Sequence, residues 1–284
     1  MVVGKTPPPL HQQLGRELAR ARNLAGIEQR DIAARIGITQ TMASRAERGR
    51  KLLSLPQIRA WAQACDAAPE TLERLLALTD SAFTYTESWG ELFTESSQLQ
   101  DAVRADEATV GTLLSYTRTV VPGLLQTPAY AESVLRLTDF AGDTDVAAAL
   151  AGRWRRQEAL SDRNRHFEFM IAEAVLRWAP YGRVEVLLAQ LDHLAAVAEQ
   201  RENVLLGILP SGSEPVLPFH DFTIYDDRGD DDPLVVTELA HSYMTIQRPR
   251  DVALYREIFG RLTPVALTAQ NASALIRRLM GELQ

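Results

Sequence analysis

The sequence predicts a small domain built only of α-helices, followed by a larger domain of the α+β class. The chain has 284 residues, which suits one or two domains at roughly 100–200 residues each. Residues 10–78 carry apolar side chains at helical spacing, interrupted by glycine and proline. Beyond residue 111, strand-like and helix-like segments cluster without strict alternation, which favours an α+β fold over a doubly wound sheet.

The N-terminal domain, residues 10–80, is predicted to hold five helices. Leu14, Leu18 and Ala21 follow the three-and-four spacing of one helical face. Glycine ends a helix well because it adopts the left-handed conformation without a steric penalty. The predicted helices are 10–25, 29–36, 40–48, 55 onward and 69–78, with stops at Gly26, Gly37 and Gly49, N-caps at Thr39 and Ser54, and first-turn prolines at Pro56 and Pro69.

The remainder is divided into a helical connector at residues 81–110, with a helix ending near residue 109, and an α+β domain at residues 111–284. No internal repeat is visible. The predicted strands are Thr112–Val120, His166–Ile171, Val204–Leu209, Phe219–Tyr225, Leu234–Leu239 and Tyr243–Ile246. The predicted helices are Pro128–Leu137, Asp145–Leu160, Val184–Glu199, Arg250–Arg261 and Thr268–Leu283.

Charge is distributed unevenly along the chain. The net charge of −7, from 30 basic and 37 acidic residues, argues against a general nucleic-acid coat or a polybasic membrane binder. Residues 1–80 nevertheless hold 12 basic and 8 acidic residues, a net of +4, which leaves −11 for the other 204 residues. This split favours a basic binding domain joined to an acidic partner domain.

The lone cysteine, Cys65, rules out an intramolecular disulfide and a cysteine-based zinc site. Its apolar helical surroundings favour a buried structural thiol over a sensor. Residues 1–9 lack the apolar core of a signal peptide, and their three consecutive prolines predict a flexible arm. No run approaches the roughly 18 apolar residues of a membrane span. We therefore expect a soluble cytoplasmic protein without membrane contact.

Residues 29–48 predict two short helices that meet at a tight turn. Ala33 is small enough for the second helix to cross closely, and Gly37 supplies the positive φ of the turn. Ile38 fills the angle between the helices, while Ala43 and Ala46 face inward at i and i+3. The side chains predicted to face outward are Gln40, Thr41, Met42, Ser44, Arg45 and Arg48.

This outward set suits the major groove of DNA. Glutamine can bond adenine bidentately, arginine can bond guanine, and threonine can meet a thymine methyl. Amides at the start of the first helix, with Gln29, suit a phosphate. The predicted DNA-binding residues are Gln29, Thr39, Gln40, Thr41, Ser44, Arg45, Arg48, Arg50 and Lys51. Two amphipathic helices and a glycine also occur in any helical bundle, but here spacing, polar face and local charge coincide.

Four stretches of residues 14–76 resemble the Xre family, the Cro/C1-type helix-turn-helix proteins. They are residues 18–22, 29–33, 37–40 and 44–49. The resemblance implies a five-helix domain whose third helix reads bases through Gln40, Thr41 and Arg45, with Gln29 at a phosphate. It also implies that Arg22 and Glu47 form a pair bridging the first and third helices.

Three positions depart from that family pattern. Glu28 stands where Ser, Thr or Asn usually caps the second helix, so we expect a poor cap there. Ala43 and Ala46 replace larger aliphatic residues. The third helix is therefore expected either to lie closer to its neighbours or to pack more weakly.

Residues 85–284 contain no enzyme signature: no Gly-rich phosphate loop, no His-Glu-x-x-His and no Gly-x-Ser-x-Gly. We therefore expect neither an enzyme nor a cofactor. The acidic segment 226–232 could hold a hard cation, but its glycine and the adjacent Pro233 favour a solvated loop. No metal site is expected, because the histidines lack ligand spacing: His11, His166, His193, His220 and His241.

Residues 121–131, 153–160 and 167–173 resemble the C-terminal domain of WhiJ-like regulators of actinobacteria. The resemblance continues through residues 190–191, 208–210 and 235–238. It implies a transcription regulator, often paired with a small BldB-type protein and described as antitoxin-like. It implies no particular ligand.

Arg153, Arg156 and Gln157 lie at i, i+3 and i+4, so they form one polar stripe of a helix, with which Glu173 could pair. One interpretation is a buried Arg–Glu network that stabilises the fold. The other is a pocket for an anionic ligand or a partner protein. The sequence leaves both open.

The leading hypothesis is a sequence-specific, dimeric transcription regulator, more a repressor than an activator. One such domain makes few base contacts, and a homodimer on a pseudo-palindromic operator in double-stranded DNA doubles them. The C-terminal domain would dimerise and sense an unknown effector or partner. The alternative is an antitoxin-like protein that binds a small BldB-type partner and regulates its own operon. An enzyme targeted to DNA is least favoured, because no nucleophile–base pair is visible.

Overall fold

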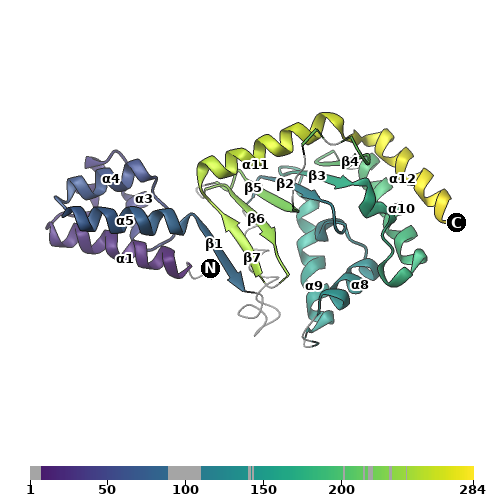
Figure 1. Ribbon diagram of the computed structural model, residues 1–284, viewed down its shortest axis with the longest axis horizontal. Helices are drawn as coiled ribbons and strands as arrows, with labels where there is room; N and C mark the ends of the chain where they lie inside the picture. The colour runs from purple at the N-terminus through teal and green to yellow at the C-terminus, as the bar shows by residue number, and fades with distance from the viewer. Residues whose placement is uncertain are drawn as a thin grey trace. The chain divides into compact units, whose positions relative to one another are not determined.

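The computed structural model describes residues 8–88, 110–139, 142, 144–200, 202–213, 215–216, 220–229, 232–240 and 242–284. The chain divides into two compact units, Met1–Tyr85 and Thr86–Gln284 (Figure 1). Within these described ranges, no helix is both long enough and apolar enough to cross a membrane. The helical first unit and the mixed second unit confirm the predicted fold class.

The first unit consists of five helices that enclose a core of their own. They are α1 (Pro9–Leu24), α2 (Gln29–Arg35), α3 (Gln40–Glu47), α4 (Leu55–Ala64) and α5 (Pro69–Ala82). All five predicted helices are present. Trp61, at the centre of this core, is fully buried, and its indole N–H donates to the Leu18 carbonyl at 3.3 Å. The other fully buried side chains include Leu14, Leu18, Ile32, Leu53, Ile58 and Leu75.

Local signals in the sequence explain where these helices begin and end. Gly37 and Gly49 have φ values of +72° and +69°, the left-handed conformation expected of them. Thr39 caps α3 by accepting a hydrogen bond from the Met42 amide at 3.1 Å. Ser54 forms a capping box with Gln57 at the start of α4. The α2 helix has no side-chain cap, as Glu28 at that position predicted.

The second unit is built on an eight-stranded mixed sheet. Its strand order is β1-β7-β6-β5-β2-β3-β4-β8. The β2–β3 and β3–β4 pairs are parallel, whereas β2–β5, β5–β6, β6–β7 and β4–β8 are antiparallel. The strands are β1 (Thr84–Ser88), β2 (Thr112–Thr117), β3 (His166–Ala172), β4 (Val204–Leu209), β5 (Phe222–Asp226), β6 (Leu234–Glu238), β7 (Ser242–Ile246) and β8 (Leu267–Thr268).

Helices cover both faces of this sheet (Figure 1). The helices are α8 (Pro128–Thr138), α9 (Val146–Gln157), α10 (Val184–Gln200), α11 (Pro249–Leu262) and α12 (Ala269–Leu283). Phe167 and Phe169 of β3 pack with α10 and α12 on one face. Met170 of β3 and Ile224 of β5 pack with α11 on the other. Successive side chains of a strand point to opposite faces of the sheet, so neighbouring residues of β3 pack against different helices.

The predicted strands and helices of the second unit are present within a few residues, although Phe219 lies outside the described residues. The helix predicted to end near residue 109 also lies outside them. Two strands were not predicted: the two-residue β8, and β1, which falls in the segment 81–110 that was predicted to be a helical connector. The first two residues of β1, Thr84 and Tyr85, belong to the first unit, and the rest belong to the second.

Candidate nucleic-acid interface

The α3 helix, which is predicted to read bases, lies directly against α1. A Cβ atom at position 15 would be 2.5 Å from the Glu47 carbonyl oxygen, and one at position 49 would be 2.7 Å from the His11 carbonyl oxygen. Two glycines thus allow backbone-to-backbone contact between α1 and the end of α3. Ala43 and Ala46 are completely buried beneath this contact. The small alanines were expected to let α3 either lie closer to its neighbours or pack more weakly. The structure shows that α3 lies closer.

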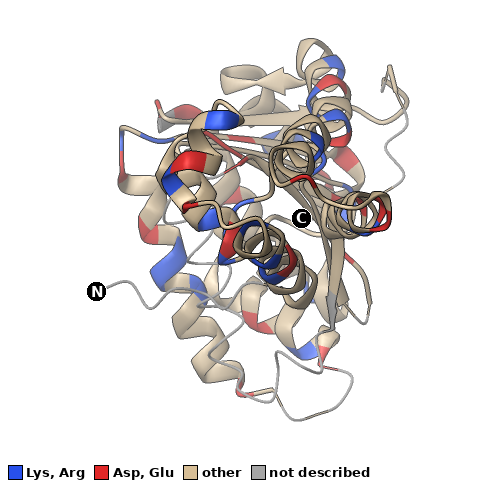
Figure 2. Ribbon diagram, turned by 90° about the vertical axis from the view of Figure 1, so that its left-hand side faces the viewer, with Lys and Arg blue, Asp and Glu red and all other residues tan. Residues whose placement is uncertain are grey.

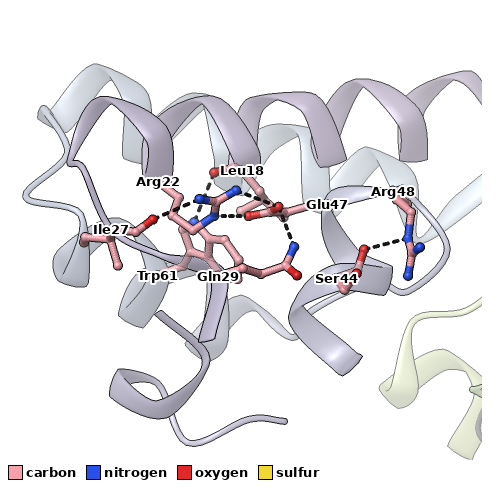
Figure 3. A network of polar contacts seen from close by, with 8 residues as sticks. All are labelled: Leu18, Arg22, Ile27, Gln29, Ser44, Glu47, Arg48 and Trp61. Carbon is pink, nitrogen blue, oxygen red and sulfur yellow. Dashed lines mark hydrogen bonds and ion pairs between the residues drawn. The ribbon is translucent and has the colours of Figure 1, made fainter. Parts of the chain in front are cut away.

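A buried carboxylate joins the first three helices (Figure 3). Glu47 of α3 accepts from Arg22 Nε at 2.5 Å and from Arg22 Nη2 at 3.0 Å. It also accepts from Gln29 Nε2 of α2 at 2.8 Å. Arg22 Nη1 donates to the Ile27 carbonyl at 2.9 Å. The pair of Arg22 and Glu47 implied by the family resemblance is therefore present, and its hydrogen bond raises the pKa of Arg22.

This network changes the expectation for Gln29. The residue was predicted to contact a phosphate, but its amide group is half-buried and donates to Glu47. A primary amide has two N–H bonds, so the second hydrogen remains for a phosphate. Gln29 is thus held in place by the same carboxylate that fixes α3.

Most predicted base-reading residues lie on the open side of α3. Gln40 and Thr41 are exposed, and Ser44 and Arg45 are half-exposed. Met42, predicted to face outward, instead packs against the helical core. The reason is helical geometry: Met42 lies one turn before Ala46, so both occupy the buried face.

The remaining predicted contacts flank this surface. Arg48 and Arg50 are exposed and Lys51 is half-exposed. Arg48 Nε donates to the Ser44 carbonyl at 3.1 Å, which aligns the guanidinium with the end of α3 (Figure 3). The Thr39 hydroxyl accepts from the Met42 amide, so its own hydrogen stays available to a phosphate.

The local positive charge of the first unit supports a nucleic-acid interface on the exposed face of α3. Residues 10–51 hold nine basic and four acidic residues, a local charge of +5. Figure 2 marks basic and acidic residues, which are interspersed along the helices of both units. One of the four acids, Glu47, is neutralised by Arg22. The exposed face of α3 and the segment after it are therefore suited to a phosphate backbone.

The polar stripe of the second unit stabilises a turn. Arg153 Nη1 donates to Gln126 Oε1 at 2.5 Å, and Gln157 Nε2 donates to the Gln126 carbonyl at 2.8 Å. Gln190 of α10 closes the same turn, donating to the Leu125 carbonyl and accepting from the Thr127 amide. These contacts favour the structural interpretation for Arg153 and Gln157.

Glu173, the predicted partner of that stripe, lies elsewhere. It accepts from the Ser211 amide at 3.1 Å, which lowers its pKa, and from Arg177 at 3.3 Å. Glu238, at the end of β6, lies within electrostatic reach of both Arg156 and Arg153 of the stripe. Although Glu238 reaches water, desolvation by the dense protein around it raises its pKa, and the positive charge of Arg156 opposes this rise.

Trp154 interrupts the stripe and points outward. Its side chain is 55 % exposed, beside a shallow pocket between α8 and α9 that Pro128, Ala131 and Leu150 help to line. The exposed Arg155 adjoins it. Sequence reasoning missed this tryptophan, because helical spacing alone does not show which face of α9 is covered.

Among the side chains that the structure describes, no group of three His, Cys, Asp or Glu residues is placed to hold a metal ion. In the acidic loop, Asp226 pairs with Arg256 of α11 at 2.7 and 2.8 Å. This pairing holds the pKa of Asp226 below its ordinary value of 3.8. The first acid of the loop therefore stabilises the attachment of α11 to the sheet.

Comparison with protein families agrees with this division of the chain. A family model described as a domain of unknown function, DUF5753, matches residues 99–278. The chain belongs to the DUF5753 family. A second model, described as a helix-turn-helix domain, matches residues 13–75 of this DUF5753 protein. The match spans α2 and α3 and the whole network around Glu47, so the first unit is a helix-turn-helix domain and the protein is a DNA-binding regulator of that class.

No curated protein matches the chain significantly. Among solved structures, similarity is found to TrmBL2, an archaeal chromatin protein whose structure is described as showing a novel mode of DNA binding. The two are 14 % identical with a TM-score of 0.32, over 74 % of this chain and 67 % of TrmBL2. Similarity this low supports no inference about fold or function.

Proposed function

We propose that this DUF5753 protein is a sequence-specific transcription regulator of the Cro/C1 type. The observation that carries the proposal is the position of α3. Backbone contact at Gly15 and Gly49 and the Arg22–Glu47–Gln29 network fix α3 in orientation, while Gln40, Thr41 and Arg45 stay on its open side. A rigid helix with such an open polar face is what major-groove reading requires.

The regulator acts as a homodimer and represses transcription. One helix-turn-helix domain contacts few base pairs, so two related copies on a pseudo-palindromic operator supply the missing specificity. The second unit, with its own core, contributes the dimer contact and receives a small-molecule or protein signal. The function is binding, and it involves no catalysis.

Selection of DNA from a random duplex library by the full chain tests this proposal. The expected result is enrichment of one sequence motif with two related half-sites. Gln40→Ala or Arg45→Ala should relax specificity at single base pairs, each by about 1–3 kcal/mol. Lys51→Ala should weaken all sequences equally and lower the salt slope by about one.

The matched control is Arg20→Ala. Two residues of an α-helix turn through about 200°, so Arg20 lies nearly opposite Arg22 and away from α3, and its side chain is 64 % exposed. It removes the same charge without touching the interface. Failure of the full chain to enrich any sequence at physiological salt would refute the proposed function.

A second function is favoured by Trp154: antitoxin-like binding of a small BldB-type protein, with DNA binding as autoregulation. An exposed tryptophan beside a shallow pocket is a common centre of protein–protein interfaces, and Trp154 has that position on α9. Arg155 next to it suits an acidic partner surface.

Co-purification of this chain with the small protein encoded by an adjacent gene tests this second function. The experiment is done with the original chain and with Trp154→Ala. The expected result is a complex with the original chain that the substitution weakens at least about tenfold, the range of an interface hot spot. Tyr181→Ala is the control, because Tyr181 is similarly exposed, at 58 %, and lies outside the α8–α9 pair. Equal loss in both variants would contradict a role for this surface.

A further inference from the structure

The sheet of the second unit changes its direction of growth at β2. From β2 the chain continues through α8 and α9 to the parallel strand β3, whereas the later strand β5 lies on the other side of β2. In open sheets with parallel strands, ligands often bind outside the carboxyl end of a strand at such a reversal. The carboxyl end of β2 therefore has the topology of a ligand site.

Antiparallel pairing brings the end of β6 to the same edge of the sheet. Tyr116 near the end of β2 lies opposite Phe222 at the start of β5, and β5 in turn pairs with β6. The Thr237 hydroxyl of β6 donates to the Asp221 carbonyl at 2.8 Å. Two acids, Asp221 before β5 and Glu238 at the end of β6, therefore lie near the carboxyl end of β2.

These two acids differ in their hydrogen bonds. The Asp221 carboxylate accepts from the Thr117 hydroxyl at 2.7 Å, from the Arg118 amide at 2.9 Å and from the Thr119 hydroxyl. The Glu238 carboxylate accepts a hydrogen bond from none of the residues that the structure describes. Asp221 thus stabilises the segment after β2, whereas Glu238 makes no such contact with the described chain.

Glu238 lies in a recess and not on an open surface. The residue is exposed to water, yet the protein around it is dense enough to desolvate its carboxylate and raise its pKa. A group that is surrounded by protein and still reached by water lines a concave surface. Arg156 and Arg153 of α9, both half-buried, are within electrostatic reach of it. The recess therefore carries charges of both signs.

The two arginines contribute differently to this recess. Arg153 is held by its bond to Gln126 Oε1 and lies against the turn at Gly123, where a Cβ would be 3.6 Å from Arg153 Nε. Arg156 lies one turn further along the same face of α9. A planar guanidinium binds a carboxylate with two parallel hydrogen bonds. Arg156 is therefore the residue suited to an anionic group, and Arg153 adds positive charge from a fixed position.

We propose that the recess formed by Glu238, Arg156 and Arg153 binds a small zwitterion, a free α-amino acid. Arg156 binds its carboxylate, and Glu238 accepts hydrogen bonds from its ammonium group. A purely anionic ligand would leave the Glu238 carboxylate desolvated and without a donor, which is unfavourable. The inference deepens the proposed function by naming the class of its effector, and it rests on that function only for the biological meaning of the ligand.

Calorimetric titration and thermal unfolding of the full chain with the twenty common L-amino acids, added one at a time, test this proposal. At least one amino acid should bind and raise the melting temperature, because a ligand of the folded state stabilises it. The deaminated acid of the same skeleton should bind at least about tenfold more weakly, since hydrogen bonds to a charged group contribute a factor of this size.

Two variants separate the roles of the charged groups. Glu238→Gln should abolish the preference, so that the amino acid and its deaminated acid bind equally. Arg156→Gln should weaken both at least about tenfold, as should Arg156→Lys, which keeps the charge but loses the two-bond geometry. The matched controls are Arg155→Gln, at the exposed next residue of α9, and Glu202→Gln, an exposed acid before β4 and so at the opposite edge of the sheet. Both controls should bind like the original chain.

Melting without ligand distinguishes this site from an internal ion pair. If Glu238 only compensated Arg156, Glu238→Gln would lower the melting temperature, because a buried charge would lose its partner. The proposal instead expects an equal or higher value. It is overturned by such a fall, by the absence of binding for all twenty amino acids, or by an unchanged preference in Glu238→Gln. These measurements use no DNA, so they decide the site whether or not the library experiment supports the proposed function.

Discussion

At the scale of single residues, Glu47 fixes the position of the helix that we propose reads DNA. Its side chain and that of Arg22 are only 8 % and 13 % exposed, so neither charge is well solvated. The replacement of a buried pair by apolar residues is often tolerated, but removal of one partner leaves a buried charge without compensation. Glu47 also orients Gln29, so one substitution should affect both stability and phosphate contact.

Glu47→Gln should destabilise the first unit by about 3 kcal/mol or more, because Arg22 stays charged and buried. Urea unfolding followed by hydrogen exchange at the buried residues of the first unit provides the measurement, because the four tryptophans of the chain do not report on this unit alone. Glu17→Gln is the control, since Glu17 pairs with Arg74 at the surface, where an ion pair contributes at most about 1 kcal/mol. Similar losses in the two variants would contradict the role assigned to burial.

Asp226 should give part of the acid sensitivity of the second unit. Its pKa is lower in the folded chain than its ordinary value of 3.8, because Arg256 hydrogen-bonds to the carboxylate. A lowered pKa gives stability that is present above pH 3.8 and is lost as pH falls through the folded value. Asp226→Asn should therefore be less stable at neutral pH and should lose less on acidification below pH 4.

Urea unfolding at a series of pH values measures this effect. Asp227→Asn, a change at the next and more exposed residue, is the matched control and should follow the original chain. If Asp226→Asn keeps the full loss of stability below pH 4, other carboxylates are responsible.

At the scale of elements, the packing of α3 on α1 depends on glycine at a helical position. Gly15 lies inside α1, where glycine normally lowers helix stability relative to alanine. It is retained where the Glu47 carbonyl leaves no room for a Cβ. The close approach of α1 and α3 thus requires an intrinsically unfavourable residue.

Gly15→Ala should destabilise the first unit by about 1–3 kcal/mol, the usual cost of overpacking, and should weaken DNA binding. Gly260→Ala should instead stabilise the second unit by about 0.5–1 kcal/mol. Gly260 lies in α11, and a Cβ at this position would have no neighbouring atom within 4 Å, so an alanine side chain there meets nothing. Thermal unfolding of both variants measures these changes. The melting temperature should fall for Gly15→Ala and rise for Gly260→Ala.

The same elements show what the sequence could predict. The boundaries of α2 and α3 follow from local signals, the Thr39 cap and the Gly37 turn, and these were predicted correctly. The close contact at Gly15 was not, because its partner, Glu47, is remote in the chain. Glu173 was paired with the wrong arginines. It accepts from the Ser211 amide, which is remote in the chain, and from Arg177, whose i+4 spacing the prediction overlooked. Strand β1 was missed because its neighbour, β7, lies far along the chain.

At the scale of the whole molecule, opposite charges are carried by different parts of one chain. The segment 10–51 has a local charge of +5, while the residues beyond 80 have −11. Phosphate attraction depends on the local field of the binding surface and falls steeply with salt. A net charge of −7 is therefore compatible with DNA binding, and the acidic part should weaken binding to random sequence.

Removal of residues 86–284, with a coiled coil added to keep the chain dimeric, should raise affinity for random duplex DNA. The acidic charge that opposes phosphate attraction is then absent. Gel-shift titration at two salt concentrations measures the effect, which should shrink at high salt. A fusion that binds random DNA no better than the full chain would contradict this electrostatic explanation.

The place of β1 in the sheet also has a consequence for biosynthesis. After the ribosome has added Ser88, another 158 residues must be made before Ile246 completes the neighbouring strand β7. At about 5–20 residues per second, this takes roughly 8–32 s. The helical unit has its own core and can fold in this interval, so a nascent chain can present a formed DNA-binding domain while one edge of its last strand still awaits a partner.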